Sequence, residues 1–311
     1  MVLARGIYHQ FRSDPELTTQ LNQFPALLRS QGLWTIAGAV ILMLVQWGIE
    51  VVKWKRMFSH SFNMSWLDAF RAVFSGLAIS MITPNRVGEF AGRIIYLPAR
   101  MRIKGTAFTF ISNLAQLLVT LFAGCLTLLF SGRAFKAMLD PAGLSAVITL
   151  LYWLTPIMTA LICMLYFTGS RWMGKLMQIR MLSRYSSQIG IIDSLSLQTL
   201  ILILVLSVCR YVLFIAQYAI LLTVSGEMPN LFALSLSVAM MFLWLAIVPT
   251  LSVAELGIRW QFAYWLFTPV LANYPVILFA VTAVWVINFI LPAVLGSVIL
   301  FFYKPFAVSA K

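Results

Sequence analysis

A polar stretch interrupts an otherwise very apolar sequence at Thr83-Pro84-Asn85-Arg86-Val87-Gly88-Glu89-Phe90-Ala91-Gly92-Arg93. A looser version follows at Val248-Pro249-Thr250-Leu251-Ser252-Val253-Ala254-Glu255-Leu256-Gly257-Ile258-Arg259. Each has a proline, then a glutamate, then an arginine one helical i,i+4 step beyond the glutamate. A membrane protein keeps such charges in its interior only where they find partners or perform a function. These two stretches, the first and second polar islands, therefore form the candidate site.

Composition indicates the class of protein. The chain has 311 residues, 61% hydrophobic and 10% charged, with a mean hydropathy of +0.93, whereas a soluble domain is about 25% charged. Uncharged stretches recur that are long enough to cross a bilayer, for which a helix needs about 20 residues. They are continuous rather than alternating, which excludes a transmembrane barrel. The sequence predicts an all-α, polytopic helical membrane protein.

The positive charge of the chain fits a membrane topology. The net charge is +13, and Lys and Arg lie mainly in clusters between apolar runs, as the positive-inside rule predicts. We therefore expect no nucleic-acid partner. Cys125, Cys163 and Cys209 lie singly in separate apolar segments and form neither a metal-binding spacing nor a disulfide framework.

A single transmembrane domain is expected over residues 33–304, between a polar N-terminal segment (1–32) and a C-terminal tail (305–311). Its first span is expected to end in Lys53-Trp54-Lys55-Arg56, an aromatic and basic group typical of a cytoplasmic boundary. Five full crossings are predicted, at residues 33–52, 105–132, 141–170, 195–224 and 276–302. The total is five to seven spans, depending on residues 231–250 and 256–272.

The polar islands are expected to lie at the turns of two re-entrant hairpins. The arm before the first island, residues 66–83, is short for a span, and a short helix is expected from Arg86 to Leu97 with Asn85 as its N-cap. With two such hairpins, residues 53–104, 171–193 and the C-terminus share the basic, cytoplasmic side. The hairpins then enter from opposite faces, as in an inverted repeat. If residues 231–250 and 256–272 each crossed the membrane fully, the C-terminus would still be cytoplasmic. The charge distribution alone therefore does not distinguish a re-entrant hairpin from two full crossings.

The charged residues of the islands are candidate ligand contacts. Glu89 and Arg93 lie on one helical face and can neutralise each other, and Glu255 and Arg259 repeat the pair. Arg86 has no local partner, and the free N–H groups of a helix start favour a phosphate or carboxylate. The alternative is that each pair only permits a buried turn, without a ligand. Two pairs in matching contexts favour a binding site.

Arg210 is a further candidate because it lies in the middle of residues 195–224. An arginine at the centre of a membrane helix costs about 2.5–3.5 kcal/mol, so it needs a partner. Glu89 and Glu255 are expected to be the only carboxylates at depth, and Gln217 lies two turns away on the same face. This position is equally compatible with two roles for Arg210, as a counter-ion in helix packing or as a contact to a lipid phosphate.

The sequence contains no recognisable catalytic constellation. His9 and His60 lie in peripheral segments without a carboxylate or cysteine partner, and there is no Walker motif, metal-ligand cluster or Ser-His-Asp order. We therefore expect no enzyme activity, cofactor or metal. A membrane-embedded transferase with Glu89 as base is disfavoured because the acid–base pair is missing.

A resemblance to a known family rests on Trp54-Lys55-Arg56, Trp66-Leu67-Asp68-Ala69-Phe70, Gly76 and the Pro-x-Arg-x-Gly-Glu core of the first island. With these residues the chain resembles the lysylphosphatidylglycerol synthase transmembrane family of flippase-like membrane proteins, over about residues 33–302. The family's other signature, Pro-Gly-Gly-x-Gly-x-x-Glu, is matched only by Pro249, Glu255 and the nearby Gly257 and Arg259. Members commonly begin with one more span before the equivalent of 33–52, and its absence here fits either an N-terminus outside the cytoplasm or a start codon placed too late.

The resemblance implies a location in the bacterial inner membrane and movement of a lipid between leaflets. In fusion members this module moves an aminoacylated phospholipid that a separate soluble domain makes. This sequence shows no such soluble domain, so the resemblance does not imply lipid synthesis here. We expect a phospholipid or polyprenyl-linked lipid headgroup to bind at Asn85, Arg86, Glu89, Arg93, Arg210, Glu255 and Arg259. The alternative is a non-transporting accessory or scaffold protein that partners an envelope-lipid enzyme in the membrane.

Overall fold

The structure is a computed structural model of the chain. It describes residues 15–59, 62–83, 86–140, 143, 145–176, 195–248 and 252–303. Within these ranges the chain forms helices and no strand, which confirms the predicted all-α class. Asn85, the predicted helix N-cap, lies outside them.

Five helices in the described part are long and apolar enough to cross a membrane. The shortest has 24 residues, more than the roughly 20 that a bilayer core requires. They coincide with the five predicted crossings and extend beyond most of them. Their bounds are Thr19–Met57, Ala99–Ala137, Ala146–Gly169, Leu197–Ser225 and Tyr274–Phe302.

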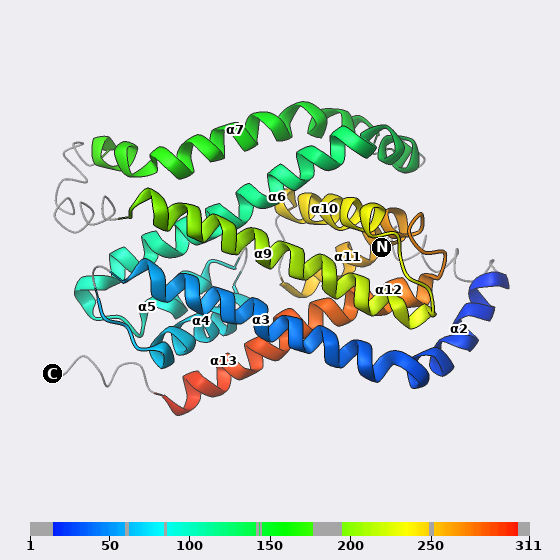
Figure 1. The fold of residues 1–311 in the computed structure, drawn as a ribbon, viewed down its shortest axis with the longest axis horizontal. Helices are drawn as coiled ribbons and strands as arrows, with labels where there is room; N and C mark the ends of the chain where they lie inside the picture. The colour runs from blue at the N-terminus through cyan, green and yellow to red at the C-terminus, as the bar shows by residue number, and fades with distance from the viewer. Residues whose placement is uncertain are drawn as a thin grey trace.

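Four of the five long helices pack in two pairs (Figure 1). α3 (Leu33–Met57), which follows α2 (Pro15–Leu27) through the π-helical turn η1 (Leu28–Gly32), lies against α9 (Leu197–Leu222). α6 (Arg102–Leu139), entered through the short η3 (Ala99–Met101), packs on α7 (Ser145–Leu176). The last crossing is α12 (Tyr274–Trp285), a π-helical turn η8 (Val286–Ile290) and α13 (Leu291–Phe302).

Two pairs of shorter helices fill the space between the long ones. α4 (Trp66–Met81) is followed by α5 (Gly88–Ile94), and α10 (Leu231–Ile247) by α11 (Ser252–Phe267). α10 follows α9 and the 3-10 turn η7 (Thr223–Ser225). α4 and α10 begin at side-chain N-caps, because Ser65 and Asn230 accept hydrogen bonds from the first turn. Within each pair, the two helices are separated by a short break at one of the polar islands, where the sequence predicted it.

The predicted helix from Arg86 to Leu97 is too long at both ends, because α5 runs only from Gly88 to Ile94. The residue before α5 is Val87, which makes no side-chain cap. Arg86 has a φ of +58°, a left-handed conformation that cannot begin a right-handed helix. The helix therefore starts later than a cap at Asn85 would place it.

Glycines bring α4 close to two of its neighbours. A Cβ atom at Gly92 of α5 would lie 2.5 Å from Cα of Gly76 in α4, and a Cβ at Gly296 of α13 would overlap the carbonyl oxygen of Phe74. Such short separations leave no room for a side chain. The short helix α4 is therefore held between α5 and α13 by backbone contact, which fixes the position of the first island.

Replacing Gly296 with alanine should destabilise the protein by about 1–3 kcal/mol, because the added methyl must displace the backbone of α4. The control is Gly48→Ala in α3, where a Cβ meets nothing within 4 Å. That change should be neutral or stabilising by up to about 1 kcal/mol, since alanine favours helix more than glycine does. The unfolding temperatures of the two variants in detergent measure the difference. Equal temperatures would contradict the packing.

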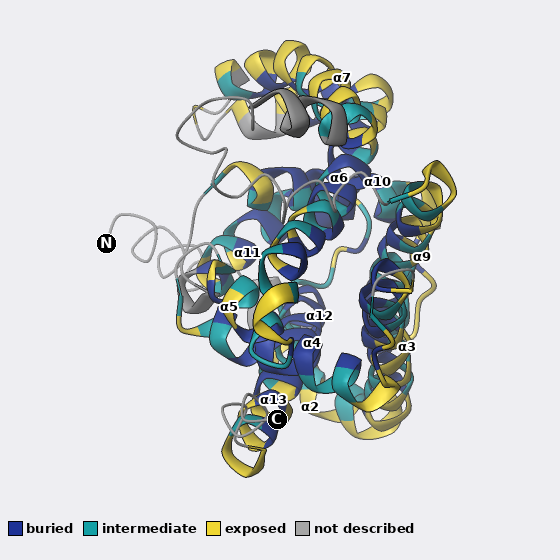
Figure 2. Ribbon diagram, turned by 90° about the vertical axis from the view of Figure 1, so that its left-hand side faces the viewer, coloured by how far each residue is buried: buried dark blue, intermediate teal, exposed yellow. Residues whose placement is uncertain are grey.

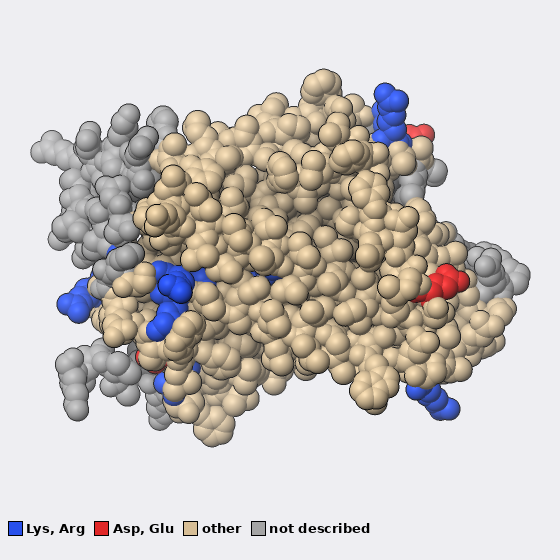
Figure 3. All heavy atoms as spheres, viewed as in Figure 1, with Lys and Arg blue, Asp and Glu red and all other residues tan. Residues whose placement is uncertain are grey.

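The face of the molecule seen in Figure 3 is divided into charged ends and an apolar middle. Lys and Arg gather at the end of the molecule that holds α5 and the C-terminal end of α3, and a broad uncharged band covers the centre. Between residues 146 and 169, α7 is mostly exposed or half-buried, whereas α4 and α12 are mostly buried (Figure 2). Trp153 on α7 is 68% exposed and Ile157 61%. Side chains of this kind suit hydrocarbon rather than water.

Candidate functional site

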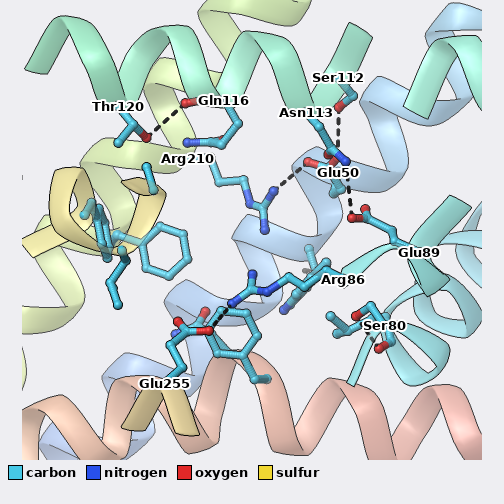
Figure 4. A pocket seen from close by; sticks show the side chains of 18 of the residues that line it. Glu50, Ser80, Arg86, Glu89, Ser112, Asn113, Gln116, Thr120, Arg210 and Glu255 are labelled. Atoms are coloured by element: carbon cyan, nitrogen blue, oxygen red, sulfur yellow. Dashed lines mark hydrogen bonds and ion pairs between the residues drawn. The ribbon is translucent and has the colours of Figure 1, made fainter. Parts of the chain in front are cut away.

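A cavity of about 530 Å³ lies among α3, α6, α9, η8 and the two pairs of short helices. Its wall contains both acidic and basic side chains as well as the aromatic rings of Trp47, Phe214, Phe242 and Phe289. Figure 4 shows that the charged groups come from different elements and point towards the same space. These charges form two clusters, each centred on one glutamate.

The first cluster is centred on Glu50 of α3, whose side chain is only 2% exposed. Its Oε1 accepts hydrogen bonds from Nη2 of Arg93 (3.2 Å) and Oγ of Ser112 (3.0 Å). Its Oε2 accepts from Nζ of Lys53 (3.2 Å) and Nη1 of Arg210 (2.8 Å). One carboxylate thus receives four hydrogen bonds and connects α3, α5, α6 and α9. Three cations around one anion satisfy the carboxylate fully but leave positive charge in excess.

Glu89 extends this cluster towards the cavity. It pairs with Arg93 one helical turn away, which confirms the predicted i,i+4 geometry. Its other oxygen, Oε2, accepts a long hydrogen bond of 3.4 Å from Nδ2 of Asn113 on α6. Arg93 is 1% exposed and Glu89 is 18% exposed. The carboxylate of Glu89 therefore lines the cavity, and Arg93 lies behind it.

The second cluster is centred on Glu255 of α11. Oε1 of Glu255 accepts from both Nε (3.0 Å) and Nη2 (2.5 Å) of Arg259, so the second predicted i,i+4 pair is also confirmed. Oε2 accepts from Nη2 of Arg86 at 2.9 Å. Arg259 also donates to the hydroxyl of Tyr218 (3.4 Å). The guanidinium of Arg86 lies 4.1 Å from the ring centre of Phe289, a cation–π contact.

The bond between Arg86 and Glu255 joins the two polar islands. The residues are 169 positions apart and belong to different pairs of short helices. Arg86 keeps 38% of its side-chain surface uncovered by protein, whereas Glu255 keeps 8%. Arg86, for which the sequence predicted no local partner, therefore finds one across the cavity.

The partner of Arg210 is different from those that the sequence suggested. Arg210 binds Glu50, not Glu89 or Glu255, and the expectation that these two are the only buried carboxylates is wrong. Among the hydrogen bonds of the described residues, none joins Gln217 to Arg210. Instead Gln217 accepts from Nε2 of Gln46 (2.7 Å) and Nδ2 of Asn288 (2.9 Å) and donates to the Ala39 carbonyl (2.8 Å). This buried amide network links α3 and α9 to η8.

Lys53 is a second residue whose position differs from the sequence prediction. The predicted boundary group Lys53-Trp54-Lys55-Arg56 places it at the membrane surface, but Lys53 and Trp54 are completely buried. Lys55 is partly exposed and Arg56 is exposed, and their place at a cytoplasmic boundary stays a prediction. The available signal was the spacing of Glu50 and Lys53, three residues apart on one helical face, which favours an ion pair.

Most predicted site residues gather around one cavity. Arg86, Glu89, Arg210, Glu255 and Arg259 line it, and Arg93 binds two of the lining carboxylates. The described residues contain no group of three or more His, Cys, Asp or Glu that could hold a metal ion. The wall offers many hydrogen-bond donors, which suit an anionic ligand.

The fold and this site define a class: a multi-pass helical membrane protein with a charged internal cavity. No protein-family model matches the chain, and comparisons with curated proteins and with solved structures give no match. The resemblance to the lysylphosphatidylglycerol synthase transmembrane family therefore stays a prediction.

Proposed function

We propose that this protein translocates a lipid across the bacterial inner membrane and binds the lipid headgroup in the central cavity. The observation that carries the proposal is the charged cavity itself, which the ion pair between Arg86 and Glu255 bridges. An apolar bilayer opposes the passage of a polar headgroup, and fixed charges in a protected cavity replace the water that the headgroup loses. The apolar outer band allows the lipid chains to remain in the bilayer.

The two pairs of short helices act as re-entrant hairpins in this proposal. α4 has 16 residues and α10 has 17, and each is shorter than the roughly 20 needed to span. Both pairs bring a break in the helix to the same cavity, where Arg86 meets Glu255. Broken helices that meet at a central site are typical of transporters built from inverted repeats. The basic end of the molecule in Figure 3 then faces the cytoplasm.

The residues suit a headgroup that contains a phosphate. Arg86 and Arg210 both line the cavity, and a guanidinium matches phosphate oxygens with two parallel N–H donors. Glu50 and Glu255 hold these arginines in place. The described residues reveal no source of energy, so the movement in this proposal is downhill or coupled to an ion gradient.

Substituting Arg210 with alanine should slow lipid movement at least about tenfold. Losing a charge-assisted hydrogen bond to the ligand costs about 1.5–3 kcal/mol, and each 1.4 kcal/mol is a factor of ten. Folding should survive, because Glu50 keeps Lys53 and Arg93 as partners. The assay is the transbilayer movement of fluorescent lipids in liposomes, with the exposed Arg56→Ala as control.

The same assay tests the function as a whole. Protein-containing liposomes should move at least one phospholipid or polyprenyl-phosphate lipid faster than empty liposomes, and Glu89→Gln and Arg93→Ala should slow that movement. Wild-type protein that moves no lipid in a broad panel would refute translocation and leave the accessory role.

A further inference from the structure

The cavity and the groups bonded to its wall contain more positive than negative charge. Five basic side chains are opposed by three carboxylates, which leaves an excess of two positive charges among the described residues. All five are joined to the three carboxylates by ion pairs. Arginine does not lose its proton in proteins. The basic residues are Lys53, Arg86, Arg93, Arg210 and Arg259, and the acidic ones are Glu50, Glu89 and Glu255.

The oxygens of the carboxylates are largely used within the protein. Glu50 accepts four hydrogen bonds, and Glu255 accepts three. Glu89 has Arg93 on one oxygen and Asn113 on the other. Little acceptor capacity is therefore left for a cationic ligand group.

The arginines, in contrast, keep donors for a ligand. In the described contacts Arg210 uses only Nη1, and its buried Nε has no partner. Arg86 uses only Nη2, although a guanidinium has five N–H donors. Figure 4 shows both guanidinium groups inside the cavity, one from α9 and the other from the first island. These unused donors, together with the charge excess, define an anion-binding space.

We infer that the ligand carries a phosphate monoester, bound as a dianion between Arg86 and Arg210. A phosphate monoester has about two negative charges above its second pKa of about 6, which balances the excess of two. A phosphodiester has only one negative charge and leaves one of the two excess positive charges unmatched. A zwitterionic headgroup has no net charge and leaves both positive charges unmatched. This inference rests on the proposed function and narrows its substrate. A lipid monoester and a soluble phosphate share this chemistry.

Proteoliposomes at pH 8 test the charge requirement directly. Labelled phosphatidic acid is the monoester, phosphatidylglycerol the singly charged diester, and phosphatidylcholine the zwitterion. We expect phosphatidic acid to move at least about tenfold faster than the other two, since one unmatched charge in a protein supplies more than the 1.4 kcal/mol of a tenfold ratio. Inorganic phosphate added outside should compete with it.

Changing the charge of the cavity should change the preference. Lys53→Met removes one positive charge and leaves Arg210 and Arg93 on Glu50, so the excess falls to one. The ratio of phosphatidic acid to phosphatidylglycerol transport should then fall about tenfold or more. The control is Lys136→Met, because Lys136 is exposed and does not line the cavity. Unfolding temperatures of both variants confirm that they are folded before the rates are compared.

The outcomes separate this inference from the proposed function. Equal transport of all three lipids, or an unchanged ratio in folded Lys53→Met, would overturn the phosphate monoester and leave translocation standing. No transport of any lipid would overturn translocation. Uptake of labelled inorganic phosphate without lipid movement would support the phosphate site and assign it to a soluble ligand. Three results together support both translocation and the phosphate monoester. Phosphatidic acid is transported faster than the other lipids, inorganic phosphate competes with it, and the ratio of phosphatidic acid to phosphatidylglycerol transport falls in Lys53→Met.

Discussion

Replacing Glu50 with glutamine is expected to destabilise this protein by about 3–5 kcal/mol, the range for breaking a buried ion pair by removing one partner. Glutamine keeps the shape of the side chain and removes its charge. Lys53, Arg93 and Arg210 then surround a neutral amide, and Lys53 and Arg93 have side chains only 1% exposed. Their charges repel one another without the water that would screen them.

A matched pair of variants separates this effect from the loss of any acidic residue. Glu227→Gln removes an exposed carboxylate in the turn before α10 and should leave the unfolding temperature in detergent unchanged. Adding Lys53→Met to Glu50→Gln removes one of the uncompensated cations and should recover part of the loss. The double-mutant cycle gives the coupling of the pair. An unfolding temperature for Glu50→Gln equal to that of Glu227→Gln would show that Glu50 does not hold the cluster together.

The local sequence indicates only the pairing of Glu50 with Lys53 and does not predict that Glu50 also binds Arg93 and Arg210. The apolar runs predicted the five long helices, because length and composition decide whether a helix can cross a bilayer. The i,i+4 spacing likewise predicted both Glu–Arg pairs, because helix geometry alone brings those side chains together. Glu50 lies next to a basic group that is typical of a membrane boundary. Only the packing of α3 against α6 and α9 shows that the helix end is buried.

The link between the islands depends on a long-range contact as well. The sequence identified Arg86 as a cation without a local partner, and the structure supplies Glu255 across the cavity. The predicted helix start failed at the same place, because Arg86 adopts a left-handed backbone conformation. Arginine rarely adopts this conformation, and nothing in the residue types around it signals the exception. Backbone strain of this kind is often retained at functional sites.

Reversing the charge of Arg86 is expected to reduce lipid movement more than any other change in the first island. In Arg86→Glu a carboxylate replaces the guanidinium that lies 2.9 Å from Glu255 and 4.1 Å from the ring of Phe289. Attraction between the islands becomes repulsion, and one of the two proposed phosphate donors is lost. Removing a ligand contact of this type costs about 2–5 kcal/mol, so transport should fall at least about thirtyfold. Stability should change little, because Arg86 is 38% exposed and Glu255 keeps Arg259.

A second substitution decides which role of Arg86 matters. Glu255→Gln in the Arg86→Glu background removes the repulsion between the islands but does not restore a donor to the ligand. If Arg86 binds the phosphate, transport stays low in the double variant. If Arg86 serves only to hold the islands together, transport recovers once the repulsion is removed, which would contradict the ligand contact. Arg100→Ala, an exposed arginine outside the cavity, should retain wild-type transport in the same liposomes. In the wild-type protein Glu255 pairs with both Arg86 and Arg259. Arg86 can therefore leave Glu255 and bind a phosphate, because Arg259 still neutralises the Glu255 carboxylate.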